Sequence, residues 1–251
     1  MSELRARAIQ GLPEVRAGDD LAQLLLTALG EQPLRDGQLL VIAHKVISKA
    51  EGAVVSLADV RPTALAREYA ADQGKDPRMV QVVLDQTSEL LRAGNGVLIC
   101  RTHHGFVCAN AGVDASNSAD ADTLVLLPRD PDASARTLRA SLRELTGASV
   151  AVLISDSFGR AWRNGQLDTA IGLAGMAALD DWRGRSDSRG LELRATWLAV
   201  ADAAAAAADL ARAKDSREPA VLIDGLERFA TREDGPGVAP LLRALAEDLF
   251  R

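Results

Sequence analysis

Short apolar runs and longer amphipathic stretches alternate along the chain, and this pattern predicts buried strands separated by helices. Apolar or alternating runs bounded by turn residues predict strands at residues 38–43, 123–127, 149–154, 191–199 and 219–224. Residues 96–101 and 105–108 predict a hairpin with His103, His104 and Gly105 at its turn, and we assign these histidines no catalytic role.

Helical periodicity or strong helix propensity marks six further stretches, at residues 20–30, 63–73, 77–92, 134–145, 202–214 and 238–250. Asp19 or Asp20 can cap the first of these, because a carboxylate there accepts from the N–H groups of the first turn. Gly147 provides a stop after the fourth. Since strands and helices interleave without a regular strand–helix–strand rhythm, we predict an α+β fold with mixed sheets and surrounding helices.

Composition narrows the class of protein. Hydrophobic residues make up 47% and charged residues 25% of the 251 residues, the balance of a folded enzyme. The net charge of −6 argues against a nucleic-acid partner, whose phosphates an acidic surface repels. Every apolar stretch is shorter than the ~20 residues that a membrane helix needs. We therefore expect a cytoplasmic protein with no membrane and no nucleic-acid partner.

The two cysteines, Cys100 and Cys108, lie in or at the end of apolar runs. Two such thiols in a chain of this length indicate reduced core residues rather than a disulfide framework. Their spacing matches no thiolate metal site.

Phosphate-binding motifs of the P-loop and dinucleotide types are absent from the sequence. Polar residues instead follow a predicted strand at Asp156 and Ser157, and a second polar segment contains Asp114 and Asn117. Carboxylate and hydroxyl oxygens suit Mg²⁺ or Mn²⁺, and the Asn117 amide can donate to a phosphate oxygen. The alternative is that both segments are turns, in which Asp and Asn tolerate tight backbone geometry.

Four cations, Lys45, Lys49, Arg160 and Arg163, flank these carboxylates in the sequence. They can neutralise a triphosphate, or they can form an ordinary exposed charged face. Trp162, between the two arginines, can stack on a flat ring or serve only in packing.

Several segments, taken in order and spacing, resemble the coenzyme F420-0:L-glutamate ligases. They are GLPEV (11–15), KVISK (45–49), GVDASN (112–117), SDSFGRAWRNGQ (155–166), DWRGR (181–185) and VAD (200–202). The resemblance covers nearly the whole chain. It implies a single unit at residues 1–251, open to division into two interleaved subdomains, and an intertwined homodimer.

The activity implied by the resemblance is the GTP-dependent joining of L-glutamate to coenzyme F420-0, or to a related deazaflavin precursor, through an acyl phosphate. Mg²⁺ or Mn²⁺ is the implied cofactor. Two alternatives stay open: another nucleotide-dependent amide ligase or phosphotransferase on the same scaffold, and a non-catalytic nucleotide-binding dimer. The sequence identifies no general base.

The resemblance also implies roles for individual residues. The nucleotide would contact Leu12, Pro13, Glu14, Val15, His44, Lys49 and Asn117. Divalent cations would be held by Asp114, Asp156 and Ser157. The deazaflavin substrate would lie near Arg160, Trp162, Arg163, Asn164 and Gly165.

Three positions depart from the family pattern. His44 stands where Ser or Thr is usual, and Ala203 stands where Glu is common. Lys214 stands at the position of a metal-binding Gln of archaeal members. Because an ammonium cannot ligate a cation, we expect Lys214 to bind nucleotide phosphate, and we leave open whether it replaces a metal ligand.

Overall fold

The computed structural model describes residues 3–115 and 122–248, and it confirms the predicted α+β class. A five-stranded sheet is the largest of its sheets, with the order β1-β12-β2-β8-β9. Its strands are β1 (Arg5–Ile9), β12 (Ala220–Asp224), β2 (Leu39–Ala43), β8 (Ala151–Arg160) and β9 (Arg163–Ala174). Strands β2 and β8 run parallel, and the other neighbouring pairs run antiparallel.

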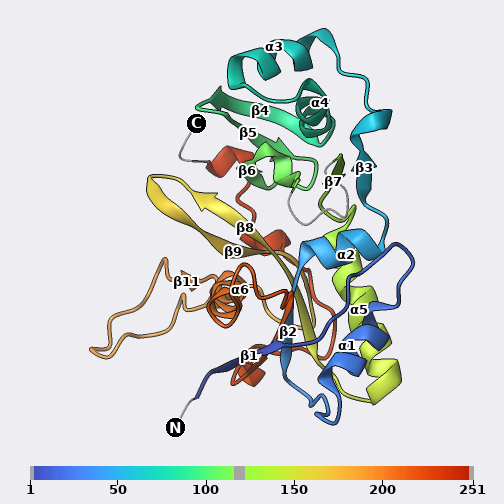
Figure 1. Cartoon of the computed structure of the whole chain (residues 1–251). Coiled ribbons are helices and arrows are strands. Elements are labelled where there is room, and N and C mark those ends of the chain that lie inside the picture. Colours follow the sequence, from blue (N-terminus) through green and yellow to red (C-terminus); the bar gives the residue numbers. More distant parts are fainter. Residues whose placement is uncertain (1–2, 116–121, 249–251) are drawn as a thin grey trace.

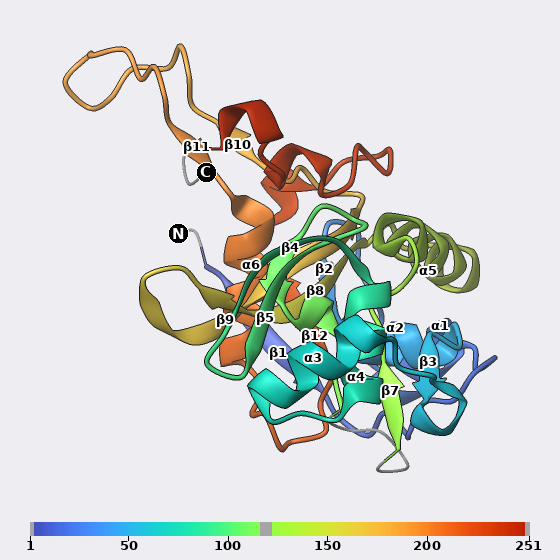
Figure 2. The same cartoon turned by 90° about the horizontal axis from the view of Figure 1, so that it is seen from above.

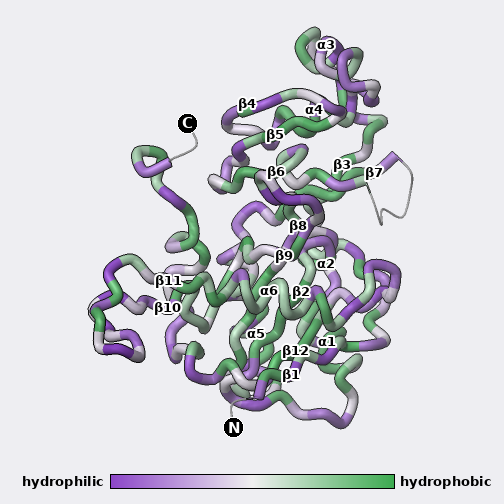
Figure 3. Tube along the Cα trace, turned by 90° about the vertical axis from the view of Figure 1, so that its left-hand side faces the viewer, coloured by the Kyte–Doolittle hydropathy of each residue, from purple (hydrophilic) through white to green (hydrophobic). Residues whose placement is uncertain are grey.

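Three helices cover the two faces of this sheet. Helices α1 (Leu21–Leu29) and α5 (Pro131–Thr146) lie on one side, and α6 (Val200–Leu210) lies on the other (Figure 1). The central strands β2 and β12 are therefore buried along most of their length, which explains their unbroken apolar sequences. Figure 3 shows hydrophobic residues concentrated along these central strands and the helices beside them.

Helix ends follow the sequence signals closely. The Asp20 carboxylate accepts from the backbone N–H of Gln23 at 3.1 Å and so caps α1. Helix α5 begins at Pro131, one turn earlier than predicted, because Asp130 caps it and Pro131 needs no N–H partner at the first position. Gly147 ends α5 in the left-handed conformation, with φ of 75°.

A second, smaller layer lies above this sheet in Figure 1. Its three-stranded sheet has the order β4-β5-β6, and helices α3 and α4 pack beside it. A two-stranded ladder, β3 with β7, joins it to the larger layer. The elements are β3 (Val54–Ser56), α3 (Ala64–Gln73), α4 (Pro77–Asp85), β4 (Thr87–Gly94), β5 (Val97–Thr102), β6 (Val107–Ala109) and β7 (Thr123–Val125). This layer has its own apolar cluster, which includes the buried Leu98 and Cys100.

A long arm leaves the body of the molecule between β9 and α6 (Figure 2). It starts and ends with the short strands β10 (Asp180–Asp181) and β11 (Trp197–Leu198), which pair with each other. Within the arm, Arg183 stacks over the Trp197 ring at 4.1 Å.

Several predicted elements differ from the structure, and tertiary pairing explains two of the differences. The helix predicted at residues 77–92 ends at Asp85, because residues from Thr87 onward pair with β5. Residues 155–166 are not a polar loop: β8 continues to Arg160 and β9 starts at Arg163, so Asp156 and Ser157 lie inside a paired strand. The Ser157 hydroxyl finds a buried partner on β9, Asp168, which a local pattern does not reveal.

Two further differences lie in the C-terminal third of the chain. Of the strand predicted at residues 191–199, only Trp197–Leu198 forms, within the arm and away from the main sheet. The closing helix predicted at residues 238–250 is replaced, up to residue 248, by the short 3₁₀ turns Ala239–Leu241 and Leu245–Glu247. Similarly, α6 ends at Leu210, so Lys214 lies beyond the helix.

Candidate functional site

Helix α2 (His44–Ala50) is the centre of the candidate site, because residues from its turns face three separate segments of the chain. Lys49 forms an ion pair with Glu14 at 2.5 Å, and Lys45 forms one with Asp114 at 2.5 Å. The ring of His44 lies 3.3 Å from the carboxylate of Asp156. One short helix therefore brings together residues that are far apart in the sequence.

The sheet explains why α2 meets Asp156. Helix α2 directly follows β2, and β2 pairs in parallel with β8, with Ala43 opposite Ser155. Parallel neighbours end at the same sheet edge, which is where ligands commonly bind. The first residue of α2 is thus held beside the first polar residues of β8.

His44 is 1% exposed, and each of its ring nitrogens approaches an oxygen. Nδ1 lies 3.3 Å from the hydroxyl of Ser48. Nε2 lies 3.3 Å from Asp156 Oδ1, but it makes no hydrogen bond within the described part of the chain. A proton or a cation between the ring and the carboxylate would satisfy both groups.

Backbone geometry fixes the second carboxylate, Asp114. Its N–H and C=O both bond to Val125, at 3.0 and 2.8 Å. The preceding residues Asn110, Ala111 and Gly112 have φ of 51°, 53° and 71°, in the left-handed region. A buried alanine in that region is strained, and such strain persists where the surrounding structure holds a functional segment.

Cys108, on β6, lies close enough to Asp156 for their charges to interact. Burial, and then the negative charge of Asp156, raise the pKa of the Cys108 thiol to about 12. Cys100, directly opposite Cys108 on β5, also has a raised pKa because of burial. Both cysteines are buried free thiols, as their apolar surroundings in the sequence predicted.

Asp168 on β9 organises the polar side chains of β8, and the sequence analysis missed it. This residue is 1% exposed. Its carboxylate accepts from the hydroxyls of Ser155 at 2.8 Å and Ser157 at 2.7 Å, and it forms an ion pair with the buried guanidinium of Arg212. Burial alone would raise the pKa of Asp168, but the bond from Ser157, the charge of Arg212 and the bond from Ser155 bring that pKa below its ordinary value. A single acidic residue just before the apolar run 170–174 was the available signal, because a buried charge requires partners.

Lys214 reaches the same cluster from beyond the end of α6. Its ammonium donates to Ser157 Oγ at 2.8 Å and to Asp209 Oδ1 at 2.9 Å, and it lies 3.6 Å from Asp168 Oδ1. The predicted phosphate-binding lysine is thus brought to the predicted metal-binding serine.

Comparisons with known proteins identify the scaffold on which this site is built. Residues 11–225 match the family described as F420-0:Gamma-glutamyl ligase. The chain belongs to this family.

Curated relatives agree with the family match. The protein named coenzyme F420:L-glutamate ligase from Methanothermobacter thermautotrophicus is 45% identical over 246 residues, which are 97% of each chain. The proteins of that name from Methanopyrus kandleri and Methanocaldococcus jannaschii are 44% and 40% identical over 240 and 241 residues. These matches cover 95% and 96% of this chain and 94% of each relative.

The donor set of this ligase-family site fits one divalent cation. Mg²⁺ in nucleotide sites commonly takes one or two carboxylates and completes its shell with phosphate oxygens and water. Asp114 and Asp156 are both partly accessible, and both adjoin the start of α2. Among residues 3–115 and 122–248, no group of three or more His, Cys, Asp or Glu side chains converges as an all-protein metal cage. A site of this type therefore needs oxygens from a bound nucleotide.

Three of the predicted nucleotide contacts lie on α2 or contact it: His44, Lys49 and Glu14. Glu14 meets Lys49, and the neighbouring Val15 is buried, which anchors the loop that also contains Leu12 and Pro13. Asn117 lies outside the described residues.

The predicted substrate residues form a separate group at the tip of the β8–β9 hairpin. Trp162 is 81% exposed with φ of 57°, and the Arg160 guanidinium donates to the Asn164 carbonyl at 2.6 Å. Arg163 and Gly165 are the other members of this tip. Arg160 is four residues along β8 from Asp156, about 13 Å at the usual strand rise. The structure therefore does not bring this tip into contact with the α2 centre.

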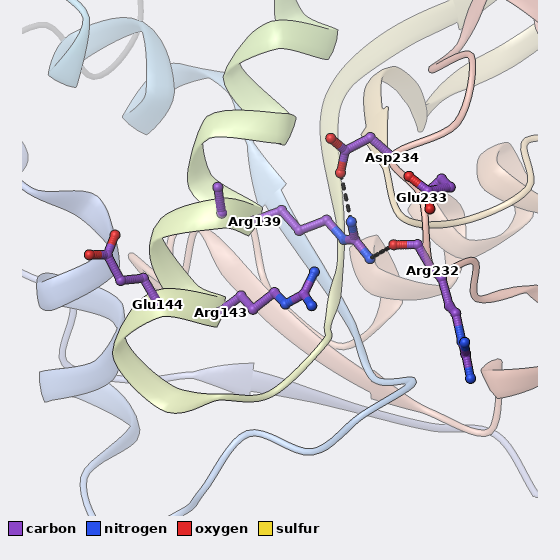
Figure 4. Close-up of a pocket in the computed structure, with 7 residues that line it drawn as sticks. Arg139, Arg143, Glu144, Arg232, Glu233 and Asp234 are labelled. Carbon is purple, nitrogen blue, oxygen red and sulfur yellow. Dashed lines mark hydrogen bonds and ion pairs between the residues drawn. The ribbon is translucent and has the colours of Figure 1, made fainter.

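A separate open hollow of about 450 Å³ lies between α5 and residues 232–234 (Figure 4). Its buried side chain, Arg139, is already bonded to Asp234 at 2.6 Å and to the Arg232 carbonyl at 3.1 Å. The remaining charges at the rim, Arg143 and Glu144 among them, are of both signs. This hollow contains none of the predicted site residues.

Among residues 3–115 and 122–248, no helix is both long and apolar enough to cross a bilayer.

Proposed function

We propose that this chain joins L-glutamate to coenzyme F420-0, or to a related deazaflavin precursor, in a reaction that consumes GTP and requires Mg²⁺ or Mn²⁺. Membership of the F420-0:gamma-glutamyl ligase family supports a ligase that forms a C–N bond to glutamate. The observation that carries the nucleotide and metal parts of the proposal is the convergence of Glu14, Asp114 and Asp156 on α2.

The proposed reaction activates a carboxylate, which is otherwise a poor electrophile. An oxygen of the precursor's terminal carboxylate attacks the γ-phosphorus of GTP, the bond to the bridging oxygen breaks, and GDP leaves. The deprotonated amine of glutamate then attacks the acyl carbon, and inorganic phosphate leaves with one oxygen of the original carboxylate. The chain contributes mainly by holding these groups in place and by stabilising their charges.

Cationic side chains of the site are proposed to hold the triphosphate. Lys49 is paired with a largely exposed glutamate, and its ammonium can exchange that partner for a phosphate oxygen. Lys214 has three N–H donors, two of which are used by Ser157 and Asp209. A divalent cation at Asp114 and Asp156 would neutralise part of the phosphate charge.

The tip of the β8–β9 hairpin is proposed to contact the deazaflavin end of the substrate. Its exposed indole can stack on a flat ring, and the two arginines beside it can meet anionic groups. The separation of about 13 Å along β8 suits an elongated substrate with its reacting carboxylate near α2.

A homodimer is proposed through the arm of residues 180–198. The arm exposes Leu191, Trp197 and Leu198, which is apolar surface that an extended arm cannot bury against its own body. Light scattering should give twice the chain mass, and removal of the three apolar side chains should give the monomer mass.

Isotope transfer tests the acyl phosphate directly. Precursor labelled with ¹⁸O in its terminal carboxylate should transfer one label to inorganic phosphate in each turnover, with GTP consumption dependent on both glutamate and precursor. GTP hydrolysis that is independent of glutamate and precursor, with no ¹⁸O label in the inorganic phosphate, would contradict the proposal.

A further inference from the structure

The hydroxyl of Ser157 has two hydrogen-bond partners. It donates its proton to Asp168 Oδ1 at 2.7 Å and accepts from the Lys214 ammonium at 2.8 Å. A hydroxyl has one donor and two acceptor positions, so one lone pair remains. A metal ion on that lone pair would lie next to a fixed ammonium.

The charges on the Lys214 side of Ser157 are already balanced by the protein. Asp168 and Asp209 supply two negative charges, and Lys214 and Arg212 supply two positive charges. A divalent cation would add two charges to a neutral cluster and would meet two neighbouring cations.

The centre at Asp114 and Asp156 has a different composition. Lys45 pairs with Asp114, and the neighbouring group at Asp156 is the buried imidazole of His44, with its Nε2 lacking a hydrogen bond within the described residues. The two sides of Asp156 and Ser157 therefore differ: one has an unsatisfied buried nitrogen, and the other has an ammonium in place.

We propose that the Lys214 ammonium takes the place that a second divalent cation would need at Ser157, so that the chain binds one such ion, at Asp114 and Asp156. This inference rests on the proposed function, from which it takes the nucleotide and the metal. Lys214 is 69% exposed on its side chain, so its remaining N–H faces the solvent side from which a phosphate or carboxylate oxygen arrives. The fixed charge thereby binds substrate oxygen without a metal at that position.

Counting bound Mn²⁺ tests the proposal without measuring activity. Mn²⁺ is titrated into the full chain with a saturating non-hydrolysable GTP analogue, and free Mn²⁺ is followed by electron paramagnetic resonance. The wild type should bind one ion per chain. Lys214→Gln removes the ammonium and adds a neutral oxygen, so it should bind a second ion, about tenfold or more tightly than any second ion in the wild type. Lys214→Arg keeps the charge and should bind one.

Ser157→Ala provides an independent check. If Ser157 holds no metal, this variant should leave the affinity for the single Mn²⁺ unchanged. Thermal melting of each variant checks that the fold is kept, which is expected for the Lys214 variants because Lys214 is exposed and lies beyond α6.

The outcomes separate this proposal from the function on which it rests. Two ions bound by the wild type, or one ion bound by Lys214→Gln, would overturn the proposal while glutamate ligation by the same samples upheld the function. No ion bound by the wild type would overturn this proposal and the metal requirement of the proposed function together.

Discussion

The Lys45 ammonium lies 2.5 Å from Asp114 Oδ2 and ties α2 to the segment that precedes β7. The adjacent residue of the same helix, His44, faces Asp156 on β8. Two carboxylates from separate segments of the chain thus contact consecutive residues of one helix. This arrangement accounts for a site at the junction of the two layers.

Replacement of either carboxylate should abolish most ligation. Asp114→Asn and Asp156→Asn each remove a ligand charge from the proposed cation site, and loss of even outer-shell metal contacts commonly costs about 10–100-fold. We expect at least about a hundredfold loss of turnover at limiting Mn²⁺. Both side chains are partly exposed, so circular dichroism should show an intact fold. Near-wild-type turnover by either variant would remove that residue from the metal site.

Removal of the Asp168 carboxylate should destabilise the fold in a pH-dependent way. Asp168→Asn leaves the buried Arg212 without its charge partner, which costs about 3–5 kcal/mol at neutral pH. The folded-state pKa of Asp168 lies below its ordinary value of 3.8, so its stabilisation is present above pH 3.8 and is lost as pH falls through the lowered pKa.

The measurement is urea unfolding of wild type and variant across the acid range. The difference in unfolding free energy between them should be constant near neutral pH and should shrink below pH 3.8. A difference that stays constant down to the lowest accessible pH would show that the ionised carboxylate is not its source.

Thiol chemistry reports on the position of Asp156. Burial and the neighbouring Asp156 raise the pKa of Cys108 to about 12, and burial raises that of Cys100, so neither thiol of the folded chain should react appreciably with Ellman's reagent at pH 8. In the urea-unfolded chain, both thiols should react with the reagent. Asp156→Asn removes one cause of the raised pKa of Cys108 and should speed the reaction of that thiol. A charge change at Arg143, which is not among the causes of this raised pKa, should leave the rate unchanged. Equal rates in wild type and Asp156→Asn would contradict the predicted proximity.

Local sequence signals predicted the elements whose causes are local. The Asp20 cap, the Gly147 stop and the apolar run of β2 appear where the pattern indicated. Residues 87–94 became a strand because they pair with β5, and pairing of that kind depends on residues elsewhere in the chain. The site residues fall into the same two groups, those in local motifs and those whose role depends on tertiary pairing.

The motif residues Glu14, Asp114 and Asp156 were found from the sequence, and the structure places each of them beside α2. Asp168 and Arg212 were missed, since neither lies in a motif and their pairing joins residues 44 positions apart. Their role is visible only when β9 is placed against β8.

The nucleotide base is predicted to be guanine, which the resemblance implies and which no side-chain pattern of the chain identifies. Initial rates with GTP and ATP at matched concentrations should favour GTP. Equal efficiency with ATP would contradict this part of the account and would leave the ligation itself untouched.

The most direct test of the central claim is product formation by the purified chain. It is incubated with GTP, Mn²⁺, L-glutamate and coenzyme F420-0, and the deazaflavin species are resolved by mass spectrometry. The account predicts a product heavier by one glutamyl residue for each glutamate joined, formed only when GTP and Mn²⁺ are both present and strongly reduced in Asp156→Asn. An unchanged deazaflavin mass with fully folded protein and all substrates present would contradict it.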